Sequence, residues 1–167
     1  DLIVTNAHVV AGADDTTVTT QSGVELDATA VYYEPEDDLA LLRVEAELPI
    51  LPVAAGDHDG APAAVLGYPE NGPYTVTPAR IGETRETLSE DSYGRGPINR
   101  TITALGGDVR SGNSGGPLLD KDGKVVGIVF AATTGGPAGG FAVPVGEVRG
   151  ALRHVSSGPV STGPCTR

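Results

Sequence analysis

The chain has 167 residues and a formal net charge of −11, because 22 Asp and Glu residues outnumber 11 Lys and Arg residues. This excess of carboxylates repels nucleic acid phosphates and anionic lipids, which excludes both as partners. No apolar run approaches the roughly 20 residues of a membrane helix, so we expect no membrane contact by this domain itself. The length indicates one domain, and 24 Gly and 13 Pro favour an all-β fold of short strands and turns.

The first 44 residues predict a group of short strands. The expected elements are a strand over 2–5, a helical turn over 7–11, a hairpin with strands over 16–21 and 24–33, and a strand over 39–44. Residues 45–61 are polar and contain prolines, so we expect them to connect this group to a second one.

The second group of strands is expected over 62–143. Its predicted strands cover 62–67, 74–87 with a break at Pro78, 98–105, 118–119, 125–130 and 141–143, with a glycine-rich loop over 133–140. Residues 144–167 are expected to form a short C-terminal helix, over 145–154, and a tail.

The run Gly112-Asn113-Ser114-Gly115-Gly116-Pro117 follows the predicted strand that ends at residue 105. Glycines on both sides of a serine cost conformational entropy in a strand. They suit a loop in which two backbone N–H groups converge beside the hydroxyl. Such an oxyanion hole contributes two to three powers of ten in rate per donor. A glycine-rich turn with a solvated serine explains the same run equally well.

Two upstream segments favour the catalytic interpretation. His8 follows the apolar run 2–4 in the segment TNAHVV, and Asp37-Asp38 precede the apolar run 39–42 in the segment DDLALL. The order histidine, aspartate, serine is that of the chymotrypsin class, whereas subtilisins and α/β-hydrolases use other orders. His58 and His154 lie in no such segment and are expected on the surface.

Together, TNAHVV, DDLALL and GNSGGP resemble the motifs of trypsin-fold serine proteases, in the bacterial branch that includes HtrA. A closer resemblance is to the extracytoplasmic domain of actinobacterial membrane-anchored serine proteases of the acid-resistance type, carried by VLGYPENGPY, TPARI and the tail STGPC. The resemblance covers nearly the whole chain. It implies two six-stranded antiparallel Greek-key barrels with a short C-terminal helix, the first barrel incomplete because the chain starts seven residues before His8.

The resemblance also implies the catalytic roles. Ser114 attacks the peptide carbonyl, His8 is the general base, and Asp38 holds the histidine in the required tautomer. Asp37 is the competitor for the third role, and Asp38 is preferred because it directly precedes the Leu-Ala-Leu-Leu run. The N–H groups of Gly112 and Ser114 are the expected oxyanion donors. No cofactor is expected, and no metal, because no residues have metal-ligand spacing.

Substrate recognition is expected along Val129, Phe130 and Ala131, where a peptide would add as an extra strand. In this fold the pocket for the residue before the cleaved bond, P1, is walled by residues 108–111 and 130–132. Asp108 lies six residues before Ser114, where a carboxylate selects Lys or Arg. Val109, Phe130 and Ala132 favour an apolar side chain instead, and this preference stays open.

The resemblance implies partners outside this chain. These are a missing N-terminal segment of the same protein, which would complete the first barrel, and a cysteine that would form a disulfide with Cys165. It also implies an extracytoplasmic location with an anchor elsewhere in the protein, and a role in acid or stress resistance. Two alternatives are an inactive trypsin-fold binding module and a fragment that is inactive without its missing strands.

Overall fold

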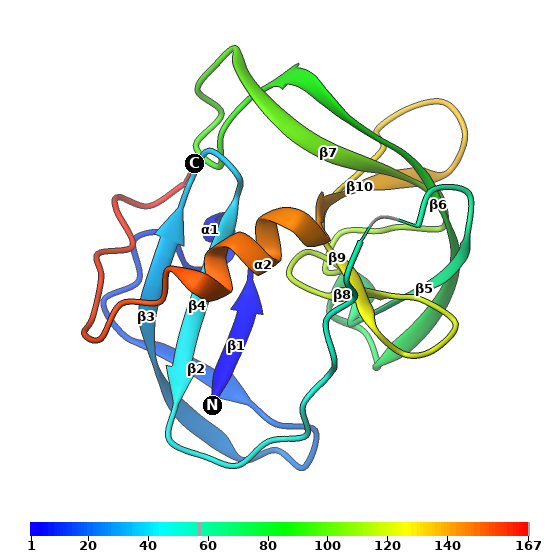
Figure 1. The fold of residues 1–167 in the computed structure, drawn as a ribbon. Helices are drawn as coiled ribbons and strands as arrows, with labels where there is room; N and C mark the ends of the chain where they lie inside the picture. The colour runs from blue at the N-terminus through cyan, green and yellow to red at the C-terminus, as the bar shows by residue number, and fades with distance from the viewer. Residues whose placement is uncertain (57, 167) are drawn as a thin grey trace.

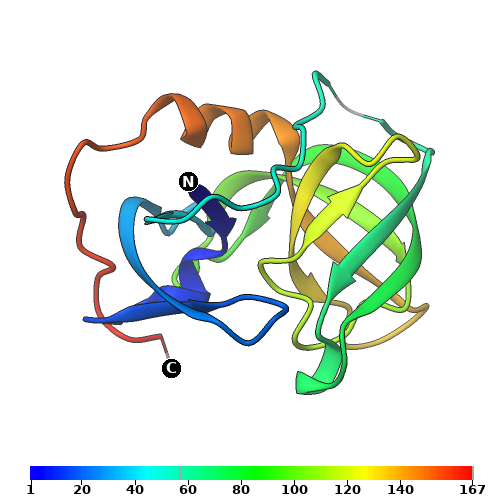
Figure 2. The same ribbon diagram turned by 90° about the horizontal axis from the view of Figure 1, so that it is seen from below.

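The computed structural model describes residues 1–56 and 58–166. A four-stranded sheet and a closed barrel lie side by side, and helix α2 crosses the junction between them (Figures 1 and 2). The sequence prediction of an all-β chain with one complete and one incomplete barrel is confirmed. No helix among the described residues is long and apolar enough to cross a membrane.

The four-stranded sheet is built from the first 44 residues and has the strand order β1-β4-β3-β2, all antiparallel. Its elements are β1 (Leu2–Thr5), α1 (Ala7–Val10), β2 (Thr16–Thr19), β3 (Glu25–Glu34) and β4 (Leu39–Val44). The apolar run of β4 explains its central place, because five of its six residues are buried between neighbours on both sides. β1 and β2 are the edge strands, so the sheet does not close.

The barrel closes in the order β10-β7-β6-β5-β8-β9. Its elements are β5 (Pro62–Gly67), the 3₁₀ turn η1 (Pro69–Asn71), β6 (Thr75–Ser89), β7 (Ile98–Gly107), β8 (Pro117–Leu119), β9 (Val125–Ala132) and β10 (Gly139–Pro144). Helix α2 (Val145–Arg153) follows directly.

Several strand bounds differ from the sequence prediction, and the differences in β6 and β10 have a clear structural reason. Strand β6 runs through Pro78 without a break. Its pairing with β7 begins one residue later, at Ala79, so Pro78 needs no N–H group on the side that faces β7. The strand instead bends at a bulge between Ile81 and Thr84. Gly139 and Gly140, predicted in a loop, begin β10, where Gly140 packs closely against Val109.

One hydrophobic cluster joins the two β units. Leu39 and Leu41 of β4 pack with Ile128 of β9, Val143 of β10 and Val148 of α2, all nearly inaccessible to solvent. A second cluster fills the barrel around Val65 and Leu118. The shared cluster fixes the sheet beside the barrel and thereby defines the junction at which the candidate catalytic residues meet.

Candidate active site

His8 and Asp38 are joined by two hydrogen bonds. The imidazole Nδ1 lies 2.8 Å from Asp38 Oδ2, and the His8 backbone N–H donates to Asp38 Oδ1 at 2.9 Å. Asp38 is buried, whereas 31% of the His8 side chain is exposed. One ring nitrogen is therefore held by a buried carboxylate, and the other, Nε2, is left for proton exchange.

Strand register explains why these two residues meet. Thr5, the last residue of β1, pairs with Ala40 near the start of β4, so the residues just after β1 lie beside those just before β4. His8 sits in α1, which begins two residues after β1 ends. Asp38 has a φ of 54°, a left-handed conformation that is uncommon outside glycine, and it closes the turn that precedes β4.

Ser114 lies on the barrel side of the junction, in the loop between β7 and β8. Gly112 and Gly115 have φ values of 88° and 80°, which only glycine adopts readily. A side chain would not fit at either position, because a Cβ on Gly112 would lie 2.5 Å from the Tyr68 carbonyl oxygen and one on Gly115 2.6 Å from Thr5 Oγ1. The glycines predicted from the sequence are therefore required by conformation and by packing.

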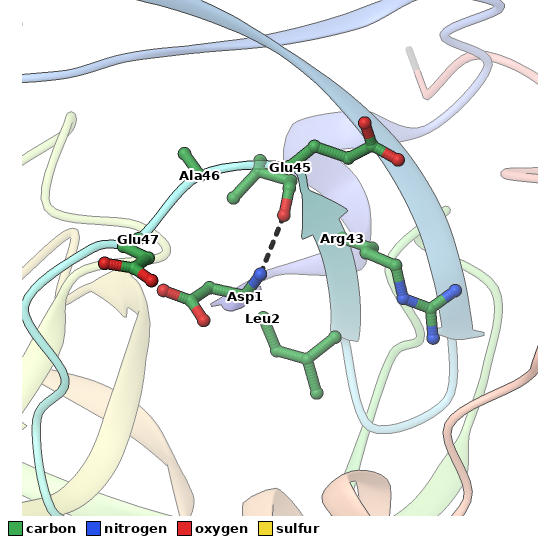
Figure 3. A pocket seen from close by; sticks show the side chains of 7 residues that line it. Asp1, Leu2, Arg43, Glu45, Ala46 and Glu47 are labelled. Atoms are coloured by element: carbon green, nitrogen blue, oxygen red, sulfur yellow. Dashed lines mark hydrogen bonds between the residues drawn. The ribbon is translucent and has the colours of Figure 1, made fainter.

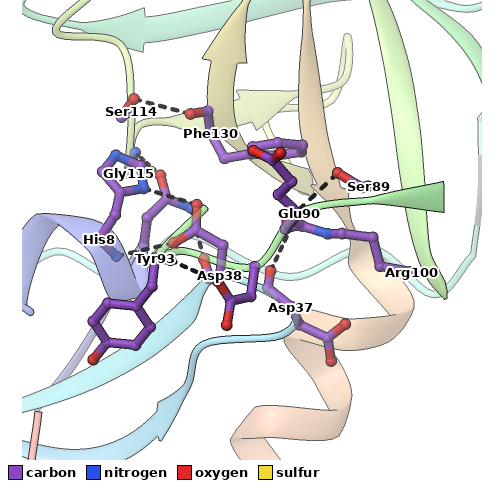
Figure 4. A network of polar contacts seen from close by, with 12 residues as sticks. His8, Asp37, Asp38, Ser89, Glu90, Tyr93, Arg100, Ser114, Gly115 and Phe130 are labelled. Carbon is purple, nitrogen blue, oxygen red and sulfur yellow. Dashed lines mark hydrogen bonds and ion pairs between the residues drawn. The ribbon is translucent and has the colours of Figure 1, made fainter. Parts of the chain in front are cut away.

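The Ser114 hydroxyl donates to the Phe130 carbonyl oxygen at 3.2 Å and not to His8 (Figure 4). A serine that gives its proton to an imidazole must come within hydrogen-bond reach of it, so the hydrogen bond to Phe130 is not the one used in the expected reaction. Catalytic hydrogen bonds are often long or unformed without substrate, and a rotation about χ1 changes the partner of a serine hydroxyl. Among the described residues, neither Gly112 N–H nor Ser114 N–H has an acceptor.

The residues predicted to bind substrate fall into two groups. Phe130, Ala131 and Ala132 are partly exposed at the end of β9 beside Ser114, whereas Val109 and Val129 are buried in the barrel core. Asp108 is exposed and its carboxylate accepts from the Arg110 guanidinium, at 2.6 Å from Nη2. The hydrogen bonds from Arg110 lower the pKa of Asp108 below its ordinary value.

Two buried polar residues at the junction were not identified as functional from the sequence. Asn6 is fully buried and bonds to both the Asp38 backbone and the Ser114 loop. Arg100 of β7 is 5% exposed, and its guanidinium carbon lies 4.4 Å from the centroid of the Phe130 ring. Burial lowers the pKa of Arg100, against the opposing effect of nearby carboxylates. The only sequence signal for Asn6 is its position as a polar residue inside the segment TNAHVV.

No group of three His, Cys, Asp or Glu side chains that could hold a metal ion occurs in the part of the chain that the structure describes. Cys165 is exposed, and its sulfur lies 3.9 Å from the Gly12 carbonyl oxygen. The tail is thus attached to the segment that follows α1, on the sheet that carries His8. This places any partner of Cys165 near that end of the sheet.

Comparison with known proteins identifies the family. A model of the trypsin-like peptidase domain matches residues 1–128. The serine protease Rv3671c of Mycobacterium tuberculosis is 41% identical over 99% of this chain, which spans 42% of that protein. A probable DegP-like periplasmic serine endoprotease of Halomonas elongata is 37% identical over 96% of the chain and 34% of its own length.

Comparison with solved structures points to the same family. The crystal structure of the Rv3671c protease described as its active form superimposes with a TM-score of 0.92 at 42% identity, covering 100% of this chain and 75% of that one. The form described as inactive gives 0.80 at 41% identity, covering 94% of this chain and 80% of that one. The HtrA-type protease AlgW gives a TM-score of 0.77 at 31% identity, covering 92% of this chain and 49% of that one. The chain therefore belongs to the trypsin-like serine protease family.

Proposed function

We propose that the chain is the peptidase domain of an endopeptidase that uses His8, Asp38 and Ser114 as its catalytic triad. The observation that carries this proposal is the His8–Asp38 pair, in which a buried carboxylate lies 2.8 Å from Nδ1. The pair lies across the junction of the two β units from a serine in a loop whose φ values require glycine. Among the described residues, the hydrogen bonds and the ion pair of His8 go to Asp38 and none goes to Asp37, which supports Asp38 as the third member of the triad.

The reaction follows from these positions. Ser114 Oγ turns from the Phe130 carbonyl to His8, attacks the peptide carbonyl carbon and gives its proton to Nε2, while Asp38 stabilises the imidazolium through Nδ1–H. Gly112 N–H and Ser114 N–H, which have no acceptor among the described residues, bind the oxyanion. His8 then protonates the leaving amine, and water hydrolyses the acyl-enzyme by the reverse proton path.

The end of β9 supplies the main-chain contacts to the peptide. β9 pairs with β10 along one side and with the short β8 on the other, and β8 pairing ends at Ile128. The Phe130 carbonyl is thus accessible to Ser114 and to a substrate N–H once the serine has turned away. A peptide is expected to bind along Phe130, Ala131 and Ala132 as an added strand.

The P1 preference is proposed to be apolar. The Asp108 carboxylate, the candidate for selecting Lys or Arg, is exposed and paired with Arg110, so a basic substrate residue would have to displace that partner. Fluorogenic peptides with P1 Leu are expected to be cleaved faster than those with P1 Arg. Asp108→Ala is expected to leave both rates within about twofold; a selective loss of cleavage after Arg would contradict this assignment.

Further proposals concern the rest of the protein, because the chain spans less than half of its curated relatives. Relatives named as periplasmic support a location outside the cytoplasm. Membrane anchoring by a segment outside this chain, a disulfide from Cys165 to a cysteine outside this chain and a role in acid or stress resistance remain proposals that rest on the family resemblance.

A preceding segment of the same protein is proposed to complete the sheet. β1 is an edge strand, and beside it lies a cleft of about 510 Å³ lined by apolar side chains, among them Leu2, Ile50 and Leu51, which are 41%, 82% and 44% exposed. In a neighbouring pocket, the Asp1 backbone nitrogen donates to the Val44 carbonyl oxygen at 2.7 Å (Figure 3). Such unpaired apolar edges are normally covered.

Peptide hydrolysis by the full-length protein and by Ser114→Ala tests the proposed function. We expect hydrolysis by the wild type and a loss of at least about 10³-fold in the variant, with an unchanged far-UV circular dichroism spectrum. Equal rates for the two proteins would refute the triad. A wild type that binds peptides without cleaving them would support the alternative of an inactive binding module.

A further inference from the structure

The proposed triad is divided between the two β units. His8, in α1, and Asp38, in the turn before β4, lie in connections of the four-stranded sheet, and Ser114 lies in a loop of the barrel. A displacement of about 1 Å between reacting groups costs on the order of 10²-fold in rate. The hydrophobic cluster that joins the units is apolar and non-directional, so it does not by itself set the alignment to that precision.

Asn6 makes a directional link across the junction. It precedes His8 by two residues, is fully buried, and uses both ends of its amide. Its Nδ2 donates to the Asp38 carbonyl oxygen at 3.0 Å, and its Oδ1 accepts from Gly115 N–H at 2.7 Å. One rigid side chain is therefore bonded to the residue after the nucleophile and to the backbone of the aspartate.

Arg100 makes a second link from the barrel to the sheet, seen beside the triad in Figure 4. Its Nη2 donates to the Asp37 carbonyl oxygen at 2.9 Å, across the junction, and Nη1 donates to the Glu90 carbonyl oxygen at 3.3 Å. The guanidinium stacks on the ring of Phe130, whose carbonyl oxygen accepts from Ser114. The same side chain thus contacts the backbone beside the aspartate and the residue bonded to the nucleophile.

The burial of Arg100 is costly. No carboxylate lies within 4.0 Å of its guanidinium among the described residues, and its Nε has no acceptor. A buried cation without a direct anionic partner generally destabilises a fold relative to an apolar side chain of the same size. The presence of a buried arginine at this position is explained if it contributes to alignment rather than to stability.

We propose that Asn6 and Arg100 are positioning residues that fix the His8–Asp38 pair relative to Ser114 across the junction of the two β units. The inference rests on the proposed function of these three residues. Neither Asn6 nor Arg100 touches the reacting atoms, so both act through the backbone of the triad and of its neighbours.

The rate at which a fluorophosphonate probe inactivates the full-length protein tests this inference. Ser114 Oγ bonds to phosphorus as fluoride leaves, and the serine proton passes to His8. Asn6→Ala and Arg100→Met are each expected to lower the saturating inactivation rate by about 10²-fold, with the half-saturating probe concentration unchanged. Arg100→Lys keeps the charge but not the planar, stacked guanidinium, and is expected to recover part of the rate.

Two matched variants separate positioning from stability. Thr103→Ala removes a buried hydroxyl bonded to Thr84 at 2.9 Å within the barrel, and Arg43→Met removes a guanidinium bonded to two carbonyl oxygens of the tail. Both are expected to lower the melting temperature but to inactivate at nearly the wild-type rate. The inference is overturned if Asn6→Ala and Arg100→Met, while folded, also stay within about twofold of wild type, or if the matched variants slow as much.

If the Asn6→Ala protein does not fold, Asn6→Asp replaces it. The aspartate side chain has the same size and can still accept from Gly115 N–H, but it cannot donate to the Asp38 carbonyl oxygen. The same slowing of inactivation is expected. A failure of the proposed function would appear separately, as a wild type that the probe does not label. The downfield proton resonance of His8 Nδ1–H then decides. It is expected to persist in the folded Asn6 variant, because His8 and Asp38 stay joined by their own two hydrogen bonds and move as a unit; its loss would show that the variant breaks the pair itself and would overturn the inference.

Discussion

Adding a single methyl group at Gly112 should damage the active site much more than it damages the fold. At a φ of 88°, an L side chain costs about 1–2 kcal/mol relative to glycine. In addition, the new Cβ would lie 2.5 Å from the Tyr68 carbonyl oxygen, so one of the two backbones must move by about 1 Å to restore ordinary contact. We expect the loop of Gly112 to move, and it carries the proposed oxyanion donors; a displacement of that size costs on the order of 10²-fold in rate.

Gly123→Ala is the matched control. Gly123 has a φ of 76°, but a Cβ there meets no atom within 4 Å. The control therefore has the conformational cost of an alanine at positive φ but no displacement of the backbone. We expect urea unfolding to show a loss of about 1–2 kcal/mol in the control and at least as much in Gly112→Ala. Peptide hydrolysis should fall about 10²-fold in Gly112→Ala only. Hydrolysis at the wild-type rate in a folded Gly112→Ala protein would refute the reasoning.

Three further outcomes are expected. Asp38→Asn should keep the fold and lower kcat by about 10⁴-fold, which steady-state kinetics with a fluorogenic peptide would measure; a loss below tenfold would exclude Asp38 from the triad. Burial and, secondarily, Asp37 raise the pKa of Glu147, so its ionisation opposes folding as the pH rises through that pKa. Glu147→Gln should therefore raise the melting temperature at about pH 7 and leave it unchanged near pH 4; equal shifts at both pH values would contradict this. Leu118→Ala, in the barrel core with no exposed surface, should cost about 2–5 kcal/mol in urea unfolding, and a loss below 1 kcal/mol would show a core that collapses around the gap.

The strands were predictable from the sequence because they depend on local patterns. The unbroken apolar run of β4 and the paired turn signals of the hairpins indicate strands without knowledge of the fold, and the strand over 39–44 agrees with β4 to the residue. The extent of β6 was not predictable in this way, because the tolerance of Pro78 depends on where pairing with β7 begins. The start of β10 depends in the same way on a partner strand.

The candidate site was predicted through its motifs, and its connecting residues were not. His8, Asp38 and Ser114 stand in segments whose residue types already indicate chemistry. Asn6 and Arg100 acquire their significance only from residues far away in the chain, such as Gly115 for Asn6 and Asp37 for Arg100. The hydrogen bond from Ser114 to the Phe130 carbonyl likewise depends on a rotamer that no sequence pattern specifies.

The central claim is that Ser114 is a nucleophile activated by His8. The most direct measurement is mass spectrometry of the full-length protein after treatment with a fluorophosphonate, followed by peptide mapping of the adduct. The account predicts one adduct, on Ser114, that forms in the wild type and forms far more slowly in a folded His8→Ala protein. An adduct on another residue, or equal labelling of Ser114 with and without His8, would contradict it.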